Sequence, residues 1–588
     1  MRLLHGAPVK ELPRGHLRVS RRAGYHSPNH FSVTVGLLKS TRCLKIFLKP
    51  VAVSHSTSSK ESLTRAKRWL RDCVRHHSCG GQSPTKGLWY PSRLLFCGSE
   101  NDSRLRLIET GEVEIEGPYM TLSHCWGAAD TLRLTTKNQD ALSFEIPLDS
   151  LPLLYRDTVQ VVRQLGVRYL WIDSLCIIQE GDHSADWHRQ VSQMADIYAH
   201  SHCNISALTA SDSHQTLYSQ SEVRERASQL VTIEESTYLV TSSLYWLSEV
   251  SFPDHGLNTR AWVLQERLVS PRVLHYGASQ LLWECRQLDA SQSHPEGVPL
   301  RMTTHALSGL RFKEFLPDLT NNASSGQRDH YGRWLDIIQR YTNCQLTFPS
   351  DRLPAISAAA KLFNIELNDE YVAGMWRRNL EKDLLWFRQG PDPRSVKVAS
   401  DNNYRCPTWS WASTDCTVHW ASLSSKSHIK VTDIQLSYVT PDTMGPIRDG
   451  WLQLRGFLRR ISLTVCECTG DPHWQMTIGN VKFDCFWPGP RVIVDTDSMA
   501  DHIVDVGQDG NLYCMHAGTV PSFSGWKALT QVLMFQLLDE EKGLYGRIGY
   551  AQAIEVPFFV DQLQKVQPEQ STFACEKYEE PFHHIRVI

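Results

Sequence analysis

The sequence predicts a doubly wound, three-layer α/β domain, followed by a helical segment and a β-rich C-terminal domain. Short strand-like apolar runs at 119–122, 169–172 and 203–208 alternate with amphipathic helical patterns, the order found in parallel sheets covered on both faces. Helical spacing of apolar residues then dominates from Trp334 to Trp386. Beyond residue 400, aromatic and β-branched runs at short spacing are typical of a β-rich fold.

Length and composition limit the class of protein. A chain of 588 residues exceeds the size of a single core, so several domains are expected. The net charge of −2 argues against nucleic acid as a partner, and no apolar run reaches the roughly 20 residues of a membrane span. Sixteen cysteines without a secretory signal are too dilute for a disulfide scaffold, which favours reduced thiols in an intracellular protein.

Residues 1–58 differ from the rest of the chain. They are rich in Lys and Arg, and Glu11 is the single acidic residue among the first 50. This composition suits a mitochondrial presequence, but no clean amphipathic helix accompanies it. We therefore favour a disordered basic leader, or an artefact of gene prediction, over a transit peptide.

The first helix is predicted at 62–76, where apolar residues recur every three or four positions. Cys73, His76, His77 and Cys79 cluster at its end. Their spacing suits zinc, but a closed zinc site needs four ligands, usually as two pairs, and no second pair follows nearby. A helix end with incidental histidines is the favoured interpretation, and no metal is predicted.

The central α/β unit is predicted element by element. Strands at 93–96 and 105–109 lead into the strand at 119–122, and a polar stretch at 131–142 reads as a loop. Ser150 and Pro152 suit the start of a helix, and Gly166 its end. The further elements are a helix from Ser184 or Asp186 to Tyr198, a strand at 203–208, a helix at 258–268 and a hairpin of 273–276 with 280–285.

Domain boundaries follow from shifts in composition. The later helices are expected to start at Trp334, Pro354 and Tyr371, and the C-terminal strands at 408–412, 428–438, 451–463, 492–495 and 532–538. The predicted organisation is a leader at 1–58, an α/β domain at 59–290 with its core at 119–285, a linker at 291–330, a helical segment at 331–390 and a β-rich domain at 400–588.

Several sequence blocks occur in a characteristic order. They are Ser123-His124-Cys125-Trp126-Gly127, Leu170-Trp171-Ile172-Asp173-Ser174-Leu175-Cys176, Asp186-Trp187, Asn258-Thr259-Arg260-Ala261-Trp262, Gln265-Glu266-Arg267 and Trp283-Glu284-Cys285. Residues 119–285 thereby resemble the fungal heterokaryon-incompatibility (HET) domain. One departure lies upstream, at Leu95-Phe96-Cys97, where the family tends to carry Asp after the Leu.

The resemblance implies a function. HET proteins act in the cytoplasm of fungi in non-self recognition, where their activation triggers programmed cell death when incompatible hyphae fuse. The domain is also thought to be distantly similar to TIR domains, some of which hydrolyse NAD with a glutamate. A TIR- or flavodoxin-like fold is therefore expected, with self-association or other HET or incompatibility proteins as partners.

Candidate site residues follow the ends of the two central strands. His124, Cys125, Asp173 and Cys176 are expected at one rim of the sheet, because ligands bind at the carboxyl ends of parallel strands. An imidazolium would activate a Cys125 thiolate, but adjacent strand residues point to opposite faces, so a structural cysteine is favoured. Asp173 serves equally well as a site residue or as a cap or ion-pair partner of Arg168 or Arg260.

Glu266 is the other candidate acid, on a short helix between Trp262 and the Trp283 strand. Its surroundings could raise its pKa for acid–base or nucleophilic work, and an ion pair with Arg260 or Arg272 is at least as plausible. Trp126 and Trp283 are candidates for stacking on a base or nicotinamide ring, with His124 and Arg260 as further binding residues.

Two functions of different classes remain open from the sequence. The HET-like domain is a signalling module, or it is an enzyme of the nucleotide-hydrolase type; a biosynthetic enzyme for a small metabolite is a third, weaker alternative. No G-x-G-x-x-G or P-loop is present, so binding through a Gly-rich turn is not indicated. No cofactor is expected, and NAD enters only as a candidate substrate.

Overall fold

A computed structural model describes much of the chain. The described residues divide into two compact units, Met1–Asn322 and Ala323–Ile588. Most of the predicted leader lies outside them, apart from three short antiparallel strands, β1 (Lys10–Leu12), β2 (His16–Ser20) and β3 (Ser32–Gly36). The described ranges are those strands, 54, 56–80, 89–99, 104–127, 131–220, 229–233, 236–240, 256–298, 311–316, 330–389, 404–420, 426–466, 473–479, 481–483, 491–494, 511–521, 528–554 and 571–588.

Unit 1 is built on an eight-stranded sheet. Its strands are β4 (Arg93–Phe96), β5 (Arg106–Glu109), β6 (Tyr119–Ser123), β7 (Tyr169–Trp171), β8 (Asn204–Ala207), β11 (Arg272–Tyr276), β12 (Leu281–Cys285) and β13 (Asp289–Ser291). They lie in the order β13-β12-β11-β8-β6-β7-β4-β5. A separate antiparallel pair consists of β9 (Gln229–Ile233) and β10 (Ser236–Val240).

The centre of the sheet is parallel. β6 pairs in parallel with both β7 and β8, and β8 pairs in parallel with β11. The predicted parallel pairing of 119–122 with 169–172 is therefore confirmed, with Thr121 opposite Trp171. The predicted hairpin is also confirmed, because β11 and β12 are antiparallel neighbours. As parallel strands share one carboxyl end, the segments after Ser123 and Trp171 emerge at the same edge.

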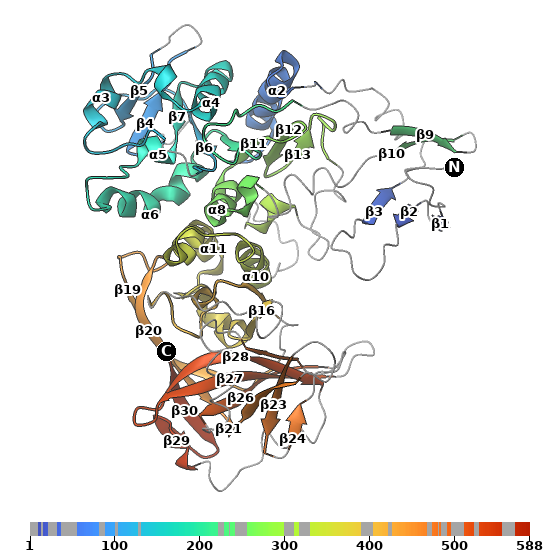
Figure 1. Cartoon of the computed structure of the whole chain (residues 1–588), viewed down its shortest axis with the longest axis vertical. Helices are drawn as coiled ribbons and strands as arrows, with labels where there is room; N and C mark the ends of the chain where they lie inside the picture. The colour runs from blue at the N-terminus through green and yellow to red at the C-terminus, as the bar shows by residue number, and fades with distance from the viewer. Residues whose placement is uncertain are drawn as a thin grey trace. The chain divides into compact units, whose positions relative to one another are not determined.

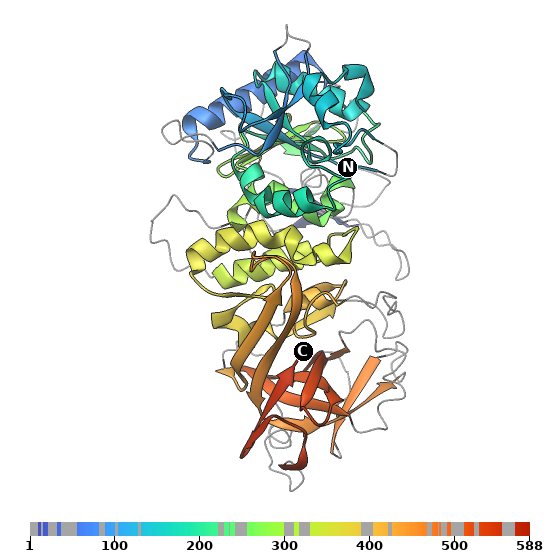
Figure 2. The ribbon, with the colours of Figure 1, turned by 90° about the vertical axis from the view of Figure 1, so that its left-hand side faces the viewer.

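Helices cover both faces of this sheet. The helices of unit 1 are α2 (Lys60–His76), α3 (Gln139–Phe144), α4 (Leu153–Gln164), α5 (Asp173–Cys176), α6 (Ala185–Ala199) and α8 (Ala261–Val269), with 3-10 turns η1 (Leu148–Ser150), η4 (Gly256–Thr259) and η5 (Phe312–Phe315). Figures 1 and 2 show α2 and α4 on one side of the strands and α6 and α8 on the other. The predicted three layers are present.

The two covered faces differ in chemistry. On the face toward α6 and α8, Ser123 and Glu284 each bind a residue of α8. On the opposite face, Trp283 packs against Trp69 of α2, with ring centroids 6.3 Å apart. The face toward α6 and α8 carries polar side chains but is buried, so these side chains must hydrogen-bond to one another or to the covering helices. Its polar residues are Thr121, Ser123, Asn204, Ser206, His275 and Glu284.

The structure of unit 1 differs from the sequence predictions in two places. Helix α3 begins within 131–142, where the sequence predicts a loop, and extends to Phe144. It buries a single side chain, Leu142, so its apolar pattern is too short to be recognised. Strand β13 ends inside the predicted linker, and a buried ion pair of Arg311 with Asp289 holds the segment that starts η5 in the same unit.

Unit 2 begins with helices. They are α10 (His330–Tyr341), α11 (Ser357–Leu367) and α12 (Leu380–Asp383), with 3-10 turns η6 (Pro349–Arg352), η7 (Pro354–Ile356), η8 (Arg377–Asn379) and η9 (Trp411–Ser413). The helices predicted from Trp334 and from Pro354 are confirmed by α10 and by η7 with α11.

The helix predicted over 371–386 is wrong. The chain there forms a tight hairpin of β14 (Tyr371–Val372) and β15 (Met375–Trp376), before η8 and α12. Ala373 and Gly374 both have positive φ, 48° and 92°, which a helix excludes. A Cβ on Gly374 would lie 2.5 Å from Nε1 of Trp411, so the turn requires glycine. Apolar spacing alone did not reveal this turn.

The rest of unit 2 is β-rich, as predicted. A ten-stranded sheet has the order β18-β26-β27-β28-β30-β20-β19, with β21, β25 and β29 pairing alongside. A strand expected at 408–412 is instead a turn followed by η9, whose start is capped by the Ser410 hydroxyl. The strands are β16 (Trp386–Gln389), β17 (Thr417–Trp420), β18 (Lys426–Ser427), β19 (Lys430–Tyr438), β20 (Ile447–Gly456), β21 (Leu458–Arg460), β22 (Ser462–Cys466), β23 (His473–Ile478), β24 (Val481–Phe483), β25 (Arg491–Val494), β26 (Leu512–Val520), β27 (Leu529–Asp539), β28 (Leu544–Ile554), β29 (Lys577–Glu579) and β30 (Phe582–Val587).

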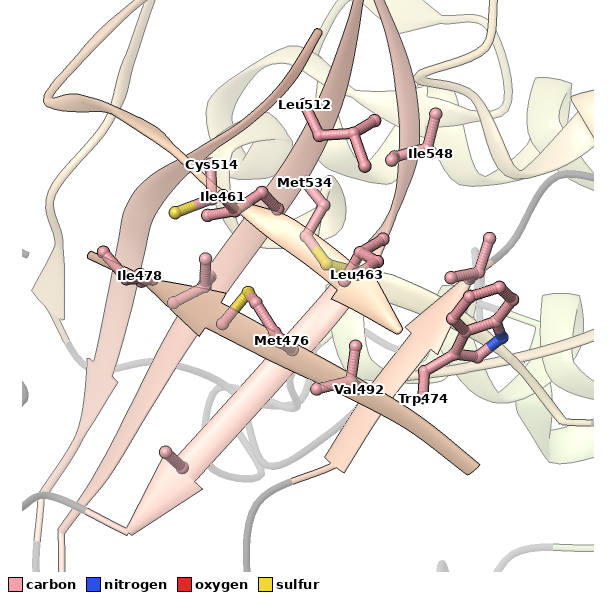
Figure 3. Packing of buried hydrophobic residues seen from close by; sticks show 14 residues of the cluster. Ile461, Leu463, Trp474, Met476, Ile478, Val492, Leu512, Cys514, Met534 and Ile548 are labelled. Atoms are coloured by element: carbon pink, nitrogen blue, oxygen red, sulfur yellow. The ribbon is translucent and has the colours of Figure 1, made fainter. Parts of the chain in front are cut away.

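One apolar core joins the two larger sheets of unit 2. The three-stranded sheet β22-β23-β24 presents Leu463 and Met476 toward Met534 and Ile548 of the ten-stranded sheet (Figure 3). All four side chains are buried. Sheet-on-sheet packing of this kind accounts for the alternating apolar pattern of the C-terminal strands.

Candidate functional site

The carboxyl ends of β6 and β7 bring most of the predicted site residues together. His124, Cys125 and Trp126 follow β6 directly, and Asp173 opens α5 just after β7. Asp173 Oδ2 accepts a hydrogen bond of 2.8 Å from the Trp126 indole. The two strand ends therefore meet, as their parallel pairing requires.

A chain of buried hydrogen bonds crosses the polar face of the sheet and ends at Glu266. The Thr121 hydroxyl donates to Asn204 Oδ1 at 3.0 Å, and Asn204 Nδ2 donates to the Ser123 hydroxyl at 2.8 Å. Ser123 in turn donates to Glu266 Oε2 at 2.5 Å. Each donor points along the chain toward the carboxylate. The partner of Glu266 in this chain of hydrogen bonds, Ser123, is therefore a neutral side chain.

The pKa of Glu266 is raised to about 7. Burial is the main cause, because it penalises the charged form, and the charge of Asp173 adds to the shift. The hydrogen bond from Ser123 and the charge of Arg260 act in the opposite direction. No ion pair joins Glu266 to Arg260 or Arg272 among the described residues. The carboxyl of Glu266 therefore exchanges its proton near neutral pH.

This shift predicts a pH dependence of stability. Between about pH 4.5 and 7 the unfolded chain has released the Glu266 proton while the folded chain retains it. The free energy of unfolding therefore falls as the pH rises through this window, by at most about 1.4 kcal/mol per pH unit, and the contribution is fully present below pH 4.5.

Urea unfolding of wild type and Glu266→Gln across this pH range measures the effect, because other titrating groups are common to both proteins. We expect the stability of wild type relative to the variant to decrease toward neutral pH. A difference that stays constant with pH would contradict the buried position of Glu266.

A second hydrogen-bonded group lies on the other side of the strand end. His124 Nε2 and the Ser174 hydroxyl each lie 2.8 Å from the Tyr155 hydroxyl on α4. Nδ1 of His124 lies 3.9 Å from Asp173 Oδ1, which also accepts from the Ser174 main-chain N–H at 2.7 Å. Asp173 thus fastens the start of α5, one of the roles the sequence left open.

Cys125 has no charged imidazole beside it to activate a thiolate nucleophile. Burial lowers the pKa of His124 to about 4, with Arg260 lowering it further and Asp173 raising it, so the ring is neutral at pH 7. Burial also raises the pKa of the Cys125 thiol and outweighs the nearby charge of Arg260, which lowers that pKa. Cys125 packs against an apolar cluster that includes Leu208 and Leu257. This environment favours a neutral, structural thiol.

Comparison with known proteins identifies the region. Residues 119–266 match the family model for the heterokaryon incompatibility protein (HET). Residues 119–266 form a HET domain. The match begins at the first residue of β6 and ends at Glu266, so it contains both hydrogen-bonded groups. No curated protein and no solved structure matches the chain.

Two predicted site residues, Cys176 and Trp283, do not belong to either hydrogen-bonded group. Cys176 is buried at the end of α5, where burial raises its pKa to about 12, and its carbonyl accepts from Arg93. Trp283 is fully buried against Trp69, so neither residue joins the Asp173 group. A stacking role for Trp283 is not compatible with this packing, because its ring is 1% exposed.

Arg260 does lie beside the strand end. Its guanidinium donates to the carbonyl of His124, and its charge acts on both Cys125 and Glu266. Arg168 pairs instead with Glu116, on the surface. Arg260 therefore ties the segment before α8 to the end of β6.

Sequence reasoning missed Ser123, Asn204 and Tyr155. Ser123 and Asn204 are polar residues within otherwise apolar strands, and polar residues buried in a sheet need partners. That signal was available, because Thr121 and Ser123 alternate on one face of β6. Tyr155 was not recognisable as a partner of His124, because the contact depends on how α4 packs.

None of the helices in the described ranges combines the length and apolar composition that a bilayer crossing requires.

Proposed function

We propose that this chain is a heterokaryon-incompatibility-type protein, which acts in the fungal cytoplasm in non-self recognition and signals programmed cell death through its HET domain. The supporting observation is the match of 119–266, which covers the parallel strands β6, β7 and β8 and both hydrogen-bonded groups. In this proposal, activation proceeds by self-association or by contact with another incompatibility protein.

The arrangement of polar groups favours a signalling module over an enzyme. Glu266, His124 and Asn204 are buried and bound to other protein groups, so they fix the loops after β6 and β7. A well-satisfied network of this kind rigidifies the segments it joins. The strand ends thereby form a defined surface that a partner can recognise.

The finer fold assignment is also part of the proposal. The parallel strands lie in the order β7-β6-β8-β11, so the first strand in the chain lies between the second and third. Flavodoxin-like sheets have this order, with ligands near the strand ends where the crossovers diverge. It supports a TIR- or flavodoxin-like HET domain.

The test of the proposed function is induced expression of the full chain in a fungal host. We expect wild type and Glu112→Gln, which alters an exposed carboxylate on the β5–β6 connection, to reduce viability. Trp171→Ala, which disrupts the core of the HET domain, is expected to abolish the effect. If folded wild type accumulates and viability is unchanged with and without an incompatible strain, the proposal fails.

A nucleotide hydrolase is the second candidate, and one observation favours it. Glu266, whose pKa is raised to about 7, is suited to accept and donate protons at neutral pH. In this alternative Glu266 acts near Asp173, with Trp126 against a base or nicotinamide ring.

Purified chain incubated with NAD and related nucleotides tests this alternative. An enzyme should lose at least about 100-fold in turnover in Glu266→Gln or Asp173→Asn, while Glu112→Gln remains active. Melting curves must accompany each variant, because loss of fold would imitate loss of catalysis. Wild type without turnover would argue against the enzyme.

A further inference from the structure

Four potential metal ligands converge at one edge of unit 1, outside the HET match. The thiols of Cys73, Cys79 and Cys285 and the imidazole of His77 all place a ligand atom within 4.8 Å of one another. Three of the residues are buried and His77 is half-buried. Among the described residues this is the one such group of histidine, cysteine and acidic side chains.

Local structure explains how the four side chains meet. Cys73 lies in the last turn of α2, and the N–H of His77 caps that turn by donating to the Cys73 carbonyl. The two residues are therefore one helical turn apart and share a face. Cys79 follows in the next segment, and Cys285 is the last residue of β12. Sheet topology brings Cys285 to His77, which lies 208 residues earlier in the sequence.

The surroundings resemble those of a metal-bound thiolate cluster. Cys285 Sγ lies 3.4 Å from His77 Nδ1 and accepts from the Leu288 main-chain N–H at 3.3 Å. Arg272 Nε donates to Cys73 Sγ at 3.2 Å. Such donors to sulfur orient first-shell ligands and stabilise their negative charge.

Arg272 is an independent indication of negative charge at the site. The guanidinium is buried, and in the described part of the chain it forms no ion pair with a carboxylate. Its other hydrogen bonds go to two main-chain carbonyls. A buried cation needs a compensating anion. Three thiolates and a neutral imidazole around a divalent ion carry a net charge of −1, which Arg272 would balance.

We infer that Cys73, His77, Cys79 and Cys285 bind one structural zinc ion. Three cysteines and one histidine form a known zinc ligand set, and soft thiolates select zinc over magnesium or calcium. Ideal tetrahedral zinc–sulfur geometry separates sulfurs by about 3.8 Å, so the ligands need only close in slightly. With all four positions filled by protein, the site has no open position for catalysis.

The zinc would fasten α2 to the sheet. Near the site, Trp69 of α2 stacks on Trp283, and its indole donates to the Pro295 carbonyl at 2.8 Å. The metal would complete this attachment by linking the end of α2 to the end of β12. Both segments lie outside 119–266, so the folded domain would extend beyond the HET match at both ends.

The sequence interpretation of this segment is thereby revised. The sequence alone favours a helix end with incidental histidines over zinc, because no second ligand pair follows Cys79 nearby. The missing ligand is Cys285, in the Trp-Glu-Cys block, and the pairing of β12 with β11 places it there. His76, the other candidate, is exposed on α2 and is not part of the group.

Metal analysis of the full chain, purified without chelators, tests the inference. We expect about one zinc per chain, and X-ray absorption with three sulfurs at about 2.3 Å and one nitrogen at about 2.0–2.1 Å. Cys285→Ser should lower zinc content at least tenfold, whereas Cys97→Ser, a buried thiol outside the group, should retain it.

A second measurement uses wild type alone, so its result does not depend on whether a variant folds. Release of bound metal with a mercurial, followed by cobalt(II) reconstitution, should give thiolate-to-cobalt charge-transfer absorption and tetrahedral d–d bands. The inference is overturned if zinc-supplemented wild type holds no metal, if cobalt gives no thiolate bands, or if non-reducing peptide mapping finds a disulfide between two of the three cysteines.

Discussion

Replacing Trp171 with alanine is expected to lower the free energy of unfolding of unit 1 by about 3–5 kcal/mol, the usual range for emptying a large aromatic site in a core. Trp171 has no exposed surface, and its ring meets Tyr198 of α6 edge-on, with centroids 5.7 Å apart. The lost stability has two parts: the free energy gained by burying the ring, and the cost of the cavity left between β7 and α6.

Urea unfolding followed by pulsed hydrogen exchange measures this loss, because peptides of unit 1 are then resolved from those of unit 2. Trp187→Ala is the matched control. Trp187 lies on α6, the helix that carries Tyr198. Its side chain is half-buried against His188, so a smaller loss of stability is expected. An unchanged unfolding midpoint for Trp171→Ala would show that the sheet is packed differently.

Neutralising Glu284 is expected to destabilise unit 1 by a similar amount, about 3–5 kcal/mol, because it leaves uncompensated buried charge. Glu284 receives two hydrogen bonds from Arg267, at 2.7 and 2.8 Å, and both side chains are buried. His275 lies 3.2 Å from the same carboxylate. The charge of Arg267 is the main cause that holds the pKa of Glu284 well below its usual value, against the effect of burial.

A double variant separates the ion pair from simple packing. Glu284→Gln should be strongly destabilised, while Glu284→Gln combined with Arg267→Met should recover much of the loss, because the buried cation in direct contact with residue 284 is gone. Glu112→Gln, on the exposed connection before β6, should change little. Equal losses in the single and double variants would contradict the charge argument.

The Arg267–Glu284 ion pair also affects the chain of buried hydrogen bonds that ends at Glu266. Arg267 follows Glu266 on α8, and the pair fixes that helix against β12. A change at Glu284 is therefore expected to disturb Glu266 through the position of α8. Effects of the two carboxylates on cell death must be compared at equal amounts of folded protein.

The sheet was predictable from the sequence because its signal is local. The continuous apolar runs at 119–122 and 169–172, separated by a helix that ends at Gly166, are sufficient to predict parallel neighbours. Their carboxyl ends then had to meet, so the contact between Trp126 and Asp173 followed from the topology. Trp283 was misjudged, because burial against Trp69 depends on where α2 packs.

The partners of Glu266 and Cys73 could not be predicted in the same way. Ser123 and Glu266 are 143 residues apart, and Cys73 and Cys285 lie still farther apart. Which strand lies beside which decides both contacts, and local periodicity does not encode strand order. At Gly374 the local pattern itself was misleading. Aromatic residues occur there at helical spacing, but a two-residue turn interrupts them.

In the proposed function, the HET domain signals as a folded module, and Glu266 with its hydrogen-bonded partners is structural. Viability of fungal cells expressing full-length Glu266→Gln, at folded levels matched to wild type, tests it most directly. We expect the variant to kill cells as wild type does, with cellular NAD unchanged in both. A folded Glu266→Gln that no longer kills, alongside wild type that consumes NAD, would contradict the claim and establish the enzyme.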